Sequence, residues 1–189
     1  MIFHNTYGGS GGDFIIHNCN AKLIILRGNS GSGKSTTAKA LQKKFGHGTM
    51  LISQDVIRRE ILYVRDGMDT KAISLLMELA NYGRENSEVV ILEGILNFIW
   101  YKELFTMLLS EYKHNIYAYY FDLSFEETLI RHRKKPNCDE FGEAEMKKWW
   151  KEKDYIEGIK EKILTKELSQ EEIVDMIYYD VTKSERGIL

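Results

Sequence analysis

Residues 28–35, with the sequence GNSGSGKS, constrain the fold of this chain more than any other segment. They fit the phosphate-binding pattern GxxxxGK[ST] at every fixed position. Glycine backbones allow successive N–H groups to converge on phosphate oxygens. Lys34 offers a positive charge to the outer phosphates, and the hydroxyl of Ser35 suits Mg²⁺. The expected nucleotide-binding residues are Gly28, Asn29, Ser30, Gly31, Ser32, Gly33, Lys34, Ser35 and Thr36.

The flanking residues favour a strand–loop–helix unit over a flexible Gly/Ser linker. Residues 22–26 (KLIIL) form a short apolar run that is typical of a buried strand. After the loop, Ala38, Leu41 and Phe45 fall on one helical face. A glycine-rich loop between a buried strand and a helix is the context in which this pattern binds phosphate. The segment therefore predicts that the protein binds a nucleoside triphosphate.

Composition limits the remaining possibilities. The 189 residues provide room for one α/β domain with a hydrophobic core. No apolar run approaches the ~20 residues of a membrane span, so we expect a cytoplasmic protein that contacts no membrane. Cys19 and Cys138 form no spaced motif and are expected to be unpaired thiols in a reducing compartment. The net charge of −2 argues against nonspecific nucleic-acid binding but not against a small anionic substrate.

Short apolar runs alternate with helical patterns beyond the loop. Strands are expected at 22–26, 49–53, 89–92, 116–121 and 163–164, and helices at 36–45, 56–64, 70–84, 97–112, from 124 onward and at 169–179. Capping boxes mark the last two helix starts. This alternation predicts a three-layer α/β fold with a parallel five-stranded sheet and helices on both faces. Ligands on such sheets bind at the carboxyl ends of the strands.

The sequence predicts one domain, at residues 21–182, with a short lid at about 131–150. A glycine-rich extension (1–20) precedes the domain, and a tail (183–189) follows it. The extension could be a flexible linker, or its apolar residues could add an edge strand. We assign it no function.

Asp55 and Arg58 follow the second strand, and their spacing puts both side chains on one face of a helix start. The carboxylate could take the proton from an acceptor hydroxyl, while Arg58 holds an anionic part of the acceptor or the moving phosphoryl group. Alternatively, Asp55 could merely cap the helix. Arg58 stands where a capping box carries Glu or Gln, and an arginine there opposes the helix dipole. This unfavourable choice favours the functional interpretation.

Glu93 ends the third strand and is the candidate carboxylate for Mg²⁺, held directly or through water. P-loop proteins place an acidic residue at the end of a strand beside the loop, and Asp is the usual choice. A solvated strand end is the alternative explanation of Glu93. Asp122, after the fourth strand, competes for the role, although it also lies at a helix entry. We expect Ser35 and Glu93 to form the metal site.

A basic run begins at Arg131, and Lys135 falls on the same helical face. Cations there could close over the triphosphate, neutralise the transferring group and exclude water. Alternatively, they form a solvated helix end that complements the helix dipole. Trp149, Trp150 and Tyr155 could pack the lid, line a substrate site or belong to the core.

The segments RGNSGSGKST, SQDVIRR, VVILEGIL and FDLSFEETLIRHRKKP resemble the small P-loop kinases grouped with zeta toxins, chloramphenicol phosphotransferases and the polynucleotide kinase domain. The resemblance implies a P-loop kinase fold in which Asp55 activates the acceptor hydroxyl and Arg58 orients it. It also implies that Arg131 and Lys135 belong to a lid. Glu93 replaces the more familiar Asp of this group, and Lys135 replaces its last lid arginine.

These features predict an ATP- and Mg²⁺-dependent phosphotransferase, monomeric or dimeric, that acts on the hydroxyl of a small acceptor such as a nucleoside, an antibiotic or a nucleotide sugar. The expected catalytic residues are Lys34, Asp55, Arg58, Arg131 and Lys135. Nothing favours GTP, because no NKxD-like segment is present. A nucleotide-dependent switch or partner-binding ATPase is the competing class, although a switch needs neither the Asp-x-x-Arg pair nor a basic lid. A kinase acting on a nucleic-acid 5′-hydroxyl is a further alternative, which the balanced charge disfavours.

Overall fold

The structure of the chain is a computed structural model that describes residues 20–134 and 142–183. Within these residues, five parallel strands form one sheet in the order β2-β3-β1-β4-β5. The strands are β1 (Lys22–Gly28), β2 (Met50–Ser53), β3 (Val89–Gly94), β4 (Ile116–Phe121) and β5 (Glu161–Leu164). All five lie where the apolar runs of the sequence predict them. Lys135 and Cys138 fall outside the described residues.

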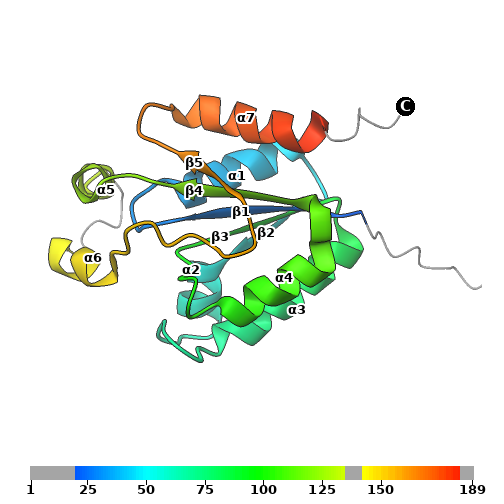
Figure 1. The fold of residues 1–189 in the computed structure, drawn as a ribbon, viewed down its shortest axis with the longest axis horizontal. Coiled ribbons are helices and arrows are strands. Elements are labelled where there is room, and N and C mark those ends of the chain that lie inside the picture. Colours follow the sequence, from blue (N-terminus) through cyan, green and yellow to red (C-terminus); the bar gives the residue numbers. More distant parts are fainter. Residues whose placement is uncertain (1–19, 135–141, 184–189) are drawn as a thin grey trace, which may run out of the picture.

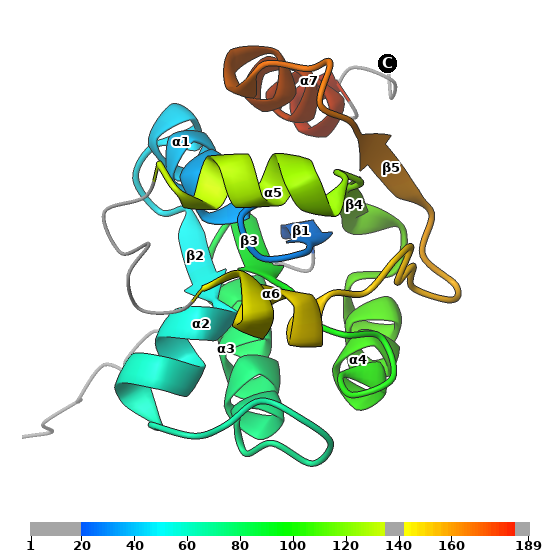
Figure 2. The same ribbon diagram turned by 90° about the vertical axis from the view of Figure 1, so that its left-hand side faces the viewer.

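Helices cover both faces of the sheet. Figure 1 shows α1 and α7 on one face and α3 and α4 on the other. Figure 2 looks onto the end of the sheet at which α5 and α6 lie. The helices of the described residues are α1 (Lys34–Phe45), α2 (Gln54–Val56), η1 (Ile57–Ile61), α3 (Ala72–Asn86), α4 (Lys102–Tyr112), η2 (Lys113–Asn115), α5 (Phe125–His132), α6 (Glu143–Trp149) and α7 (Gln170–Lys183). The three-layer α/β fold predicted from the sequence is therefore confirmed.

The central strand β1 supplies side chains to both layers of the core. Leu23 and Ile25 belong to the cluster under α3 and α4, whereas Ile24 and Leu26 belong to the cluster under α1 and α7. Successive side chains of a strand point to opposite faces of the sheet. A strand that is buried on both faces is therefore apolar along most of its length, which explains the uninterrupted run from Leu23 to Leu26 within β1.

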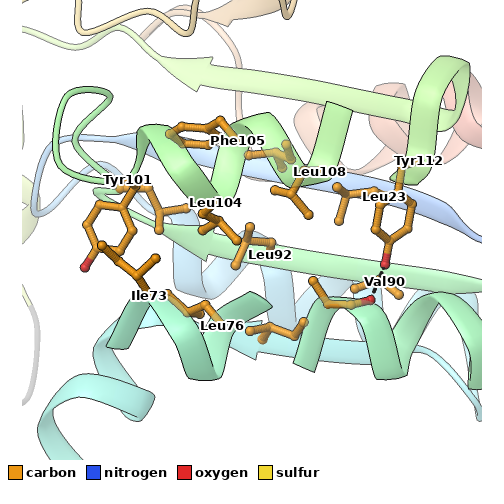
Figure 3. Close-up of a cluster of buried hydrophobic side chains, with 14 of the residues drawn as sticks. Leu23, Ile73, Leu76, Val90, Leu92, Tyr101, Leu104, Phe105, Leu108 and Tyr112 are labelled. Atoms are coloured by element: carbon orange, nitrogen blue, oxygen red, sulfur yellow. Dashed lines mark hydrogen bonds between the residues drawn. The ribbon is translucent and has the colours of Figure 1, made fainter. Parts of the chain in front are cut away.

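Figure 3 shows the cluster on the α3–α4 face. Leu104 and Leu108 of α4 are fully buried beside Leu76 of α3. The Tyr112 hydroxyl donates a 2.7 Å hydrogen bond to the Ala80 carbonyl of α3. Burial raises the pKa of Tyr112 above its usual value. This packing fixes α4 against α3 and so holds the chain that enters α4 from the carboxyl end of β3.

Two helix starts follow the predicted capping boxes. The Ser124 hydroxyl accepts a hydrogen bond from the Glu127 N–H at the start of α5. At the start of α7, the Ser169 hydroxyl accepts from the Glu172 N–H, and the Ser169 N–H donates to the Glu172 carboxylate at 2.8 Å. No described helix combines the length and the apolar character that a membrane crossing requires.

Two predicted helices differ in detail. The helix expected at 56–64 is instead a short α-helical turn followed by the π-helical turn η1, in which Leu62 N–H donates to the Ile57 carbonyl at 2.9 Å. Tyr63 then takes a φ of 52°, which ends the helix. Single π-helical turns are often found at functional sites. The helix expected from 97 begins only at Lys102.

Candidate active site

The glycine-rich loop joins the carboxyl end of β1 to the start of α1. Helix N-termini attract anions, because unpaired N–H groups and the helix dipole point outward there. Gly33 precedes α1 with a φ of 105°, a conformation that L side chains rarely adopt. A Cβ on Gly31 would come within 2.6 Å of the Thr128 carbonyl oxygen of α5. Both glycines are therefore required by the backbone of the loop and its close contact with α5.

Lys34 folds back over this loop. Its side chain is largely buried, and Nζ donates hydrogen bonds to the Asn29 carbonyl at 2.8 Å and to Ser32 Oγ at 3.3 Å. The ammonium group therefore lies within the concavity that the loop forms. A phosphate group bound by the loop N–H groups would meet this cation directly.

Glu93 is buried between two hydroxyl groups. Ser35 Oγ donates to its Oε2 at 3.0 Å, and Ser53 Oγ donates to its Oε1 at 2.5 Å. The competing Asp122 instead accepts a 3.5 Å hydrogen bond from the Tyr155 hydroxyl. The structure thus brings Ser35 and Glu93 together, as the sequence predicts for the metal site.

The oxygen atoms around Glu93 fit Mg²⁺. A carboxylate that is 3% exposed normally has a cationic partner, but within the described residues no cation lies at ion-pair distance from Glu93. The same residues contain no cluster of three His, Cys, Asp or Glu side chains that could hold a metal alone. Mg²⁺ prefers oxygen ligands and is usually held by one or two carboxylates together with water and substrate phosphates. A single buried carboxylate beside the P-loop hydroxyl suits that arrangement.

Asp55 and Arg58 form the pair that their spacing predicts. Arg58 Nη2 lies 2.7 Å from Asp55 Oδ1, and Arg59 Nε lies 3.5 Å from the same oxygen. The helix begins at Gln54 with Ser53 at the cap position, so Asp55 lies inside the first turn and does not cap it. Both ion pairs use Oδ1, and within the described part of the chain Oδ2 makes neither an ion pair nor a hydrogen bond. The carboxylate is half-exposed and can meet a substrate hydroxyl.

A pocket of about 490 Å³ joins the P-loop to this pair. Its lining includes Ser30 of the loop, the Asp55–Arg58 pair, and residues from α6 and the chain after it. We call it the arginine pocket, and its lining residues are Ser30, Asp55, Arg58, Arg59, Arg65, Asp66, Ile95, Asn97, Trp100, Lys148, Trp149 and Lys151. Its volume lies in the range of ordinary small-molecule sites.

Arg131 lies at a second pocket that also borders the P-loop. Its Nη1 donates to the Ser32 carbonyl at 3.1 Å, and its Nε donates to the Glu127 carboxylate at 2.6 Å. This second pocket, of about 530 Å³, is bounded by the chain between β5 and α7. We call it the β5–α7 pocket, and its lining residues are Gly31, Ser32, Gly33, Thr36, Thr37, Phe121, Arg131, Lys166, Glu167, Leu168, Ser169, Gln170 and Ile173. The structure thus places Arg131 against the loop, as expected, whereas Lys135 lies outside the described residues.

Gln54 is a site residue that sequence reasoning missed. It is 1% exposed, and its Nε2 donates to the Tyr101 hydroxyl at 2.6 Å and to the Asp66 carboxylate at 3.0 Å. Its Oε1 accepts from the Ile95 N–H at 3.0 Å. Burial, together with the Asp66 carboxylate, raises the pKa of Tyr101. This network ties three segments around the arginine pocket, and no periodicity in the sequence marks it.

Arg27 is the second missed residue, and it lies directly before the P-loop. Its guanidinium is fully buried and donates to Glu161 at 3.0 and 3.1 Å and to Asp154 at 2.7 Å. It also donates two hydrogen bonds to the Leu96 carbonyl. A lone charge at the end of an apolar run was the available signal. Arg27 thereby connects β1 to the chain after β3, to the chain after α6 and to β5.

The three aromatic residues near the predicted lid have different positions. Trp149 lines the arginine pocket and is 40% exposed. The Trp150 ring packs edge-on against Phe125 of α5, with centroids 5.2 Å apart. The Tyr155 ring packs edge-on against Tyr120 of β4 at 5.1 Å. Only Trp149 of the three lines either of the two pockets described above.

Comparison with solved structures shows the fold. The Mycobacterium tuberculosis APS kinase CysC, in complex with AMPPNP and APS, is 17% identical, with a TM-score of 0.65, over 87% of this chain and 98% of that one. A gluconokinase from Sinorhizobium meliloti 1021 is 16% identical, with a TM-score of 0.63, over 89% and 96% of the two chains. The tunicamycin resistance protein of Deinococcus radiodurans is 16% identical, with a TM-score of 0.56, over 85% and 95%. The fold is therefore that of P-loop kinases.

Two sequence comparisons extend this result. A segment of 78 residues is 36% identical to the rat (Rattus norvegicus) 2′,3′-cyclic-nucleotide 3′-phosphodiesterase. The match covers 41% of this chain but only 18% of that protein, so the chain spans less than a fifth of its length. The family model AAA_33, described as an AAA domain, matches residues 23–159, which include the P-loop, Asp55 and Glu93. The chain therefore belongs to the AAA_33 family of AAA domains.

Proposed function

We propose that the protein is an ATP- and Mg²⁺-dependent phosphotransferase that moves the γ-phosphoryl group to a hydroxyl of a small-molecule acceptor such as a nucleoside, an antibiotic or a nucleotide sugar. One observation carries the proposal: Asp55 and Arg58 line the same pocket as Ser30 of the P-loop. A switch needs no carboxylate that faces a small-molecule pocket beside its phosphate loop. The kinases among the structural neighbours support the same reaction class.

The donor nucleotide would lie across the P-loop. The loop N–H groups and Lys34 would bind its phosphates, and the β5–α7 pocket would take its nucleoside. Arg131 is held against the Ser32 carbonyl and can neutralise charge on the transferring group. Ser35 and Glu93 would hold Mg²⁺, which supplies further charge neutralisation at the phosphates.

Asp55 is the proposed base. Its Oδ2 takes the proton of the acceptor hydroxyl while the hydroxyl oxygen forms a bond to the γ-phosphorus. The bond from that phosphorus to the β–γ bridging oxygen breaks, and its electron pair leaves with the nucleoside diphosphate. Arg58 holds Asp55 through Oδ1 and so keeps Oδ2 oriented towards the acceptor hydroxyl. The same guanidinium offsets the negative charge of an anionic group on the acceptor.

A lid at about residues 131–150, with cations that close over the triphosphate, remains part of the proposal. The reciprocal hydrogen bonds between Asn29 and the backbone of Lys151 support a lid next to the P-loop, because they join the chain after α6 to that loop. A role for Lys135 in the lid, a place in the zeta toxin-like group of kinases and a cytoplasmic location remain parts of the proposal. The 78-residue match to the rat protein covers too little of it to support a phosphodiesterase activity in this chain.

The test uses γ-labelled ATP, Mg²⁺ and a panel of hydroxyl acceptors: nucleosides, aminoglycosides, nucleotide sugars and 5′-hydroxyl oligonucleotides. Asp55→Asn should retain nucleotide affinity while transfer falls by about 100-fold or more. Lys34→Ala should lose both nucleotide binding and phosphoryl transfer. Asp69→Asn is the matched control, because Asp69 is exposed, lies outside the arginine pocket and has a positive φ that Asn also tolerates.

Three outcomes would contradict the proposal. Unchanged transfer by Asp55→Asn would show that the assigned base is wrong. Retained activity of Lys34→Ala would contradict nucleotide binding by the loop. ATP hydrolysis that rises only with a protein partner, and with none of the acceptors, would establish the switch instead.

A further inference from the structure

The arginine pocket carries an excess of positive charge. Three arginines and two lysines line it, against two aspartates, which gives a formal charge of +3. The cationic residues are Arg58, Arg59, Arg65, Lys148 and Lys151. The chain as a whole has a net charge of −2, so this concentration is local. A pocket of one charge sign raises the local concentration of ligands of the opposite sign.

The two aspartates do not cancel this charge. Asp66 accepts hydrogen bonds from the neutral groups of Gln54 and Tyr101, and Asp55 is shared by Arg58 and Arg59. Three cations of the pocket therefore remain without a carboxylate: within residues 20–134 and 142–183 they make no ion pair. These cations are Arg65, Lys148 and Lys151.

Arg58 provides a second, independent indication of a ligand. Its Nε is buried but has no hydrogen-bond partner in the described part of the chain. Buried guanidinium N–H groups nearly always donate a hydrogen bond. An oxygen of a bound ligand would satisfy this donor. The planar fork of an arginine matches the oxygens of a phosphate group especially well.

Three large apolar or aromatic side chains also line the pocket, beside the polar residues Ser30 and Asn97. Trp100 lies in the chain between β3 and α4, and Trp149 lies at the end of α6, so two separate segments each bring an indole to the pocket. Ile95 adds a third apolar surface. Nucleobases and other planar rings stack favourably on aromatic side chains. An acceptor without a ring would leave these surfaces uncovered.

We infer that the acceptor is a ring-bearing alcohol that also carries a phosphate group, and that the arginine pocket binds all three parts. The phosphate is bound by Arg58, Arg59 and Arg65, the ring packs on Trp149, and the hydroxyl lies at Asp55. A nucleotide with a free hydroxyl has this chemistry, and the pocket volume suits one such unit. The inference rests on the proposed phosphotransfer, because it identifies the second substrate of that reaction.

Calorimetric titration of the full chain tests the binding. The protein is saturated with AMPPNP and Mg²⁺, so that the donor site is filled, and is titrated with uridine 3′-monophosphate, uridine and glycerol 3-phosphate. We expect the nucleotide to bind at least about tenfold more tightly than either partial ligand, because charge-assisted hydrogen bonds to phosphate are strong. Arg65→Gln should reduce the preference for the nucleotide over uridine to less than about threefold. Lys43→Gln, on an exposed lysine at the far end of α1, should leave it unchanged.

A 5′-hydroxyl oligonucleotide that ends in the same unit distinguishes the source of the phosphate. Equal affinity for the mononucleotide and the oligonucleotide supports a free nucleotide as acceptor, whereas a much tighter oligonucleotide identifies a nucleic-acid end. The inference is overturned if uridine binds as tightly as its phosphate, if none of these ligands binds, or if Arg65→Gln weakens uridine and uridine 3′-monophosphate equally.

Turnover with ATP is measured separately on the same ligands. Tight binding of the nucleotide without transfer to it would contradict the proposed phosphotransfer and leave the binding inference in place. Transfer to alcohols that lack a phosphate, with no preference for the phosphorylated ones, would support the proposed phosphotransfer and contradict the binding inference.

Discussion

The side-chain amide of Asn29 and the backbone of Lys151 exchange two hydrogen bonds. Asn29 Nδ2 donates to the Lys151 carbonyl at 2.6 Å, and the Lys151 N–H donates to Asn29 Oδ1 at 3.0 Å. Asn29 belongs to the P-loop, and Lys151 lines the arginine pocket. The pair therefore joins the wall of the arginine pocket to the loop that is expected to bind phosphate.

Asn29→Ala should weaken the acceptor side of the reaction more than the donor side. Loss of both hydrogen bonds frees the chain after α6, so KM for the acceptor should rise about tenfold, as expected for two modest hydrogen bonds. The nucleotide Kd should change by less than about twofold. Steady-state kinetics and nucleotide titration measure the two quantities. A rise in the nucleotide Kd as large as the rise in the acceptor KM would show that Asn29 supports both sites equally and would contradict this prediction.

Glu93→Gln should shift the Mg²⁺ requirement. The amide keeps its shape but loses the charge that attracts the cation, so the Mg²⁺ concentration for half-maximal activity should rise at least about tenfold. Ser53→Ala should shift it by only about twofold, because Ser53 orients the carboxylate and would not bind the metal itself. Activity is measured against Mg²⁺ concentration. An unchanged Mg²⁺ requirement in Glu93→Gln would contradict the role of Glu93 and make Asp122 the candidate carboxylate for Mg²⁺.

Arg27→Met should destabilise the fold by about 3–5 kcal/mol, because it leaves the Asp154 and Glu161 carboxylates beside an apolar side chain. Burial already raises the pKa of Glu161 above 4.5, and the Arg27 guanidinium opposes that rise. A group whose pKa is raised in the folded chain contributes stability below its pKa in the unfolded chain. That contribution is lost as the pH rises through the folded-state pKa. The deficit of the variant should therefore be largest at neutral pH and shrink towards pH 4.5.

Urea unfolding at several pH values checks this prediction. Arg27→Lys is the matched variant, because it keeps the positive charge but not the fork that reaches both carboxylates. It should fall between the wild type and Arg27→Met. A deficit that is constant with pH would show that lost packing, and not the carboxylates, accounts for the instability.

Buried tyrosines should resist alkaline titration. Burial raises the pKa of Tyr120 to about 12 and also raises those of Tyr101, Tyr112 and Tyr119. Because these groups ionise more readily in the unfolded chain, stability should fall as pH rises above about 10. Absorbance at 295 nm should show the exposed tyrosines ionising first and the buried ones only as circular dichroism reports unfolding. Ionisation of all tyrosines in one step near pH 10, with the fold intact, would contradict this prediction.

The sequence was sufficient where local pattern determines structure. The apolar runs of β1 to β4 and the capping serines at 124 and 169 lie where expected, because strand burial and helix capping depend on neighbouring residues. The weakest strand signal belonged to β5, an edge strand whose middle two residues are exposed. The P-loop was recognisable because its geometry requires glycine at fixed positions.

The sequence was insufficient where distant segments meet. Asn29 and Lys151 are 122 residues apart, and Arg27 and Glu161 are 134 apart. Neither periodicity nor spacing can pair residues at such separations. The arginine pocket is a further example, because its cations come from η1, from the following loop, from α6 and from the chain after α6, and only the fold brings them together.

The ion pairs of Arg27 also determine how much of the chain must fold as one cooperative unit. The segment matched by the family model ends at residue 159, two residues before Glu161 and the start of β5. A chain cut there would keep the P-loop, Asp55 and Glu93, yet it would lose a carboxylate partner of Arg27 and the apolar residues Leu164 and Ile177. The part of the sequence that identifies the family is thus smaller than the part that can be stable, and no truncation at that boundary should yield a folded protein.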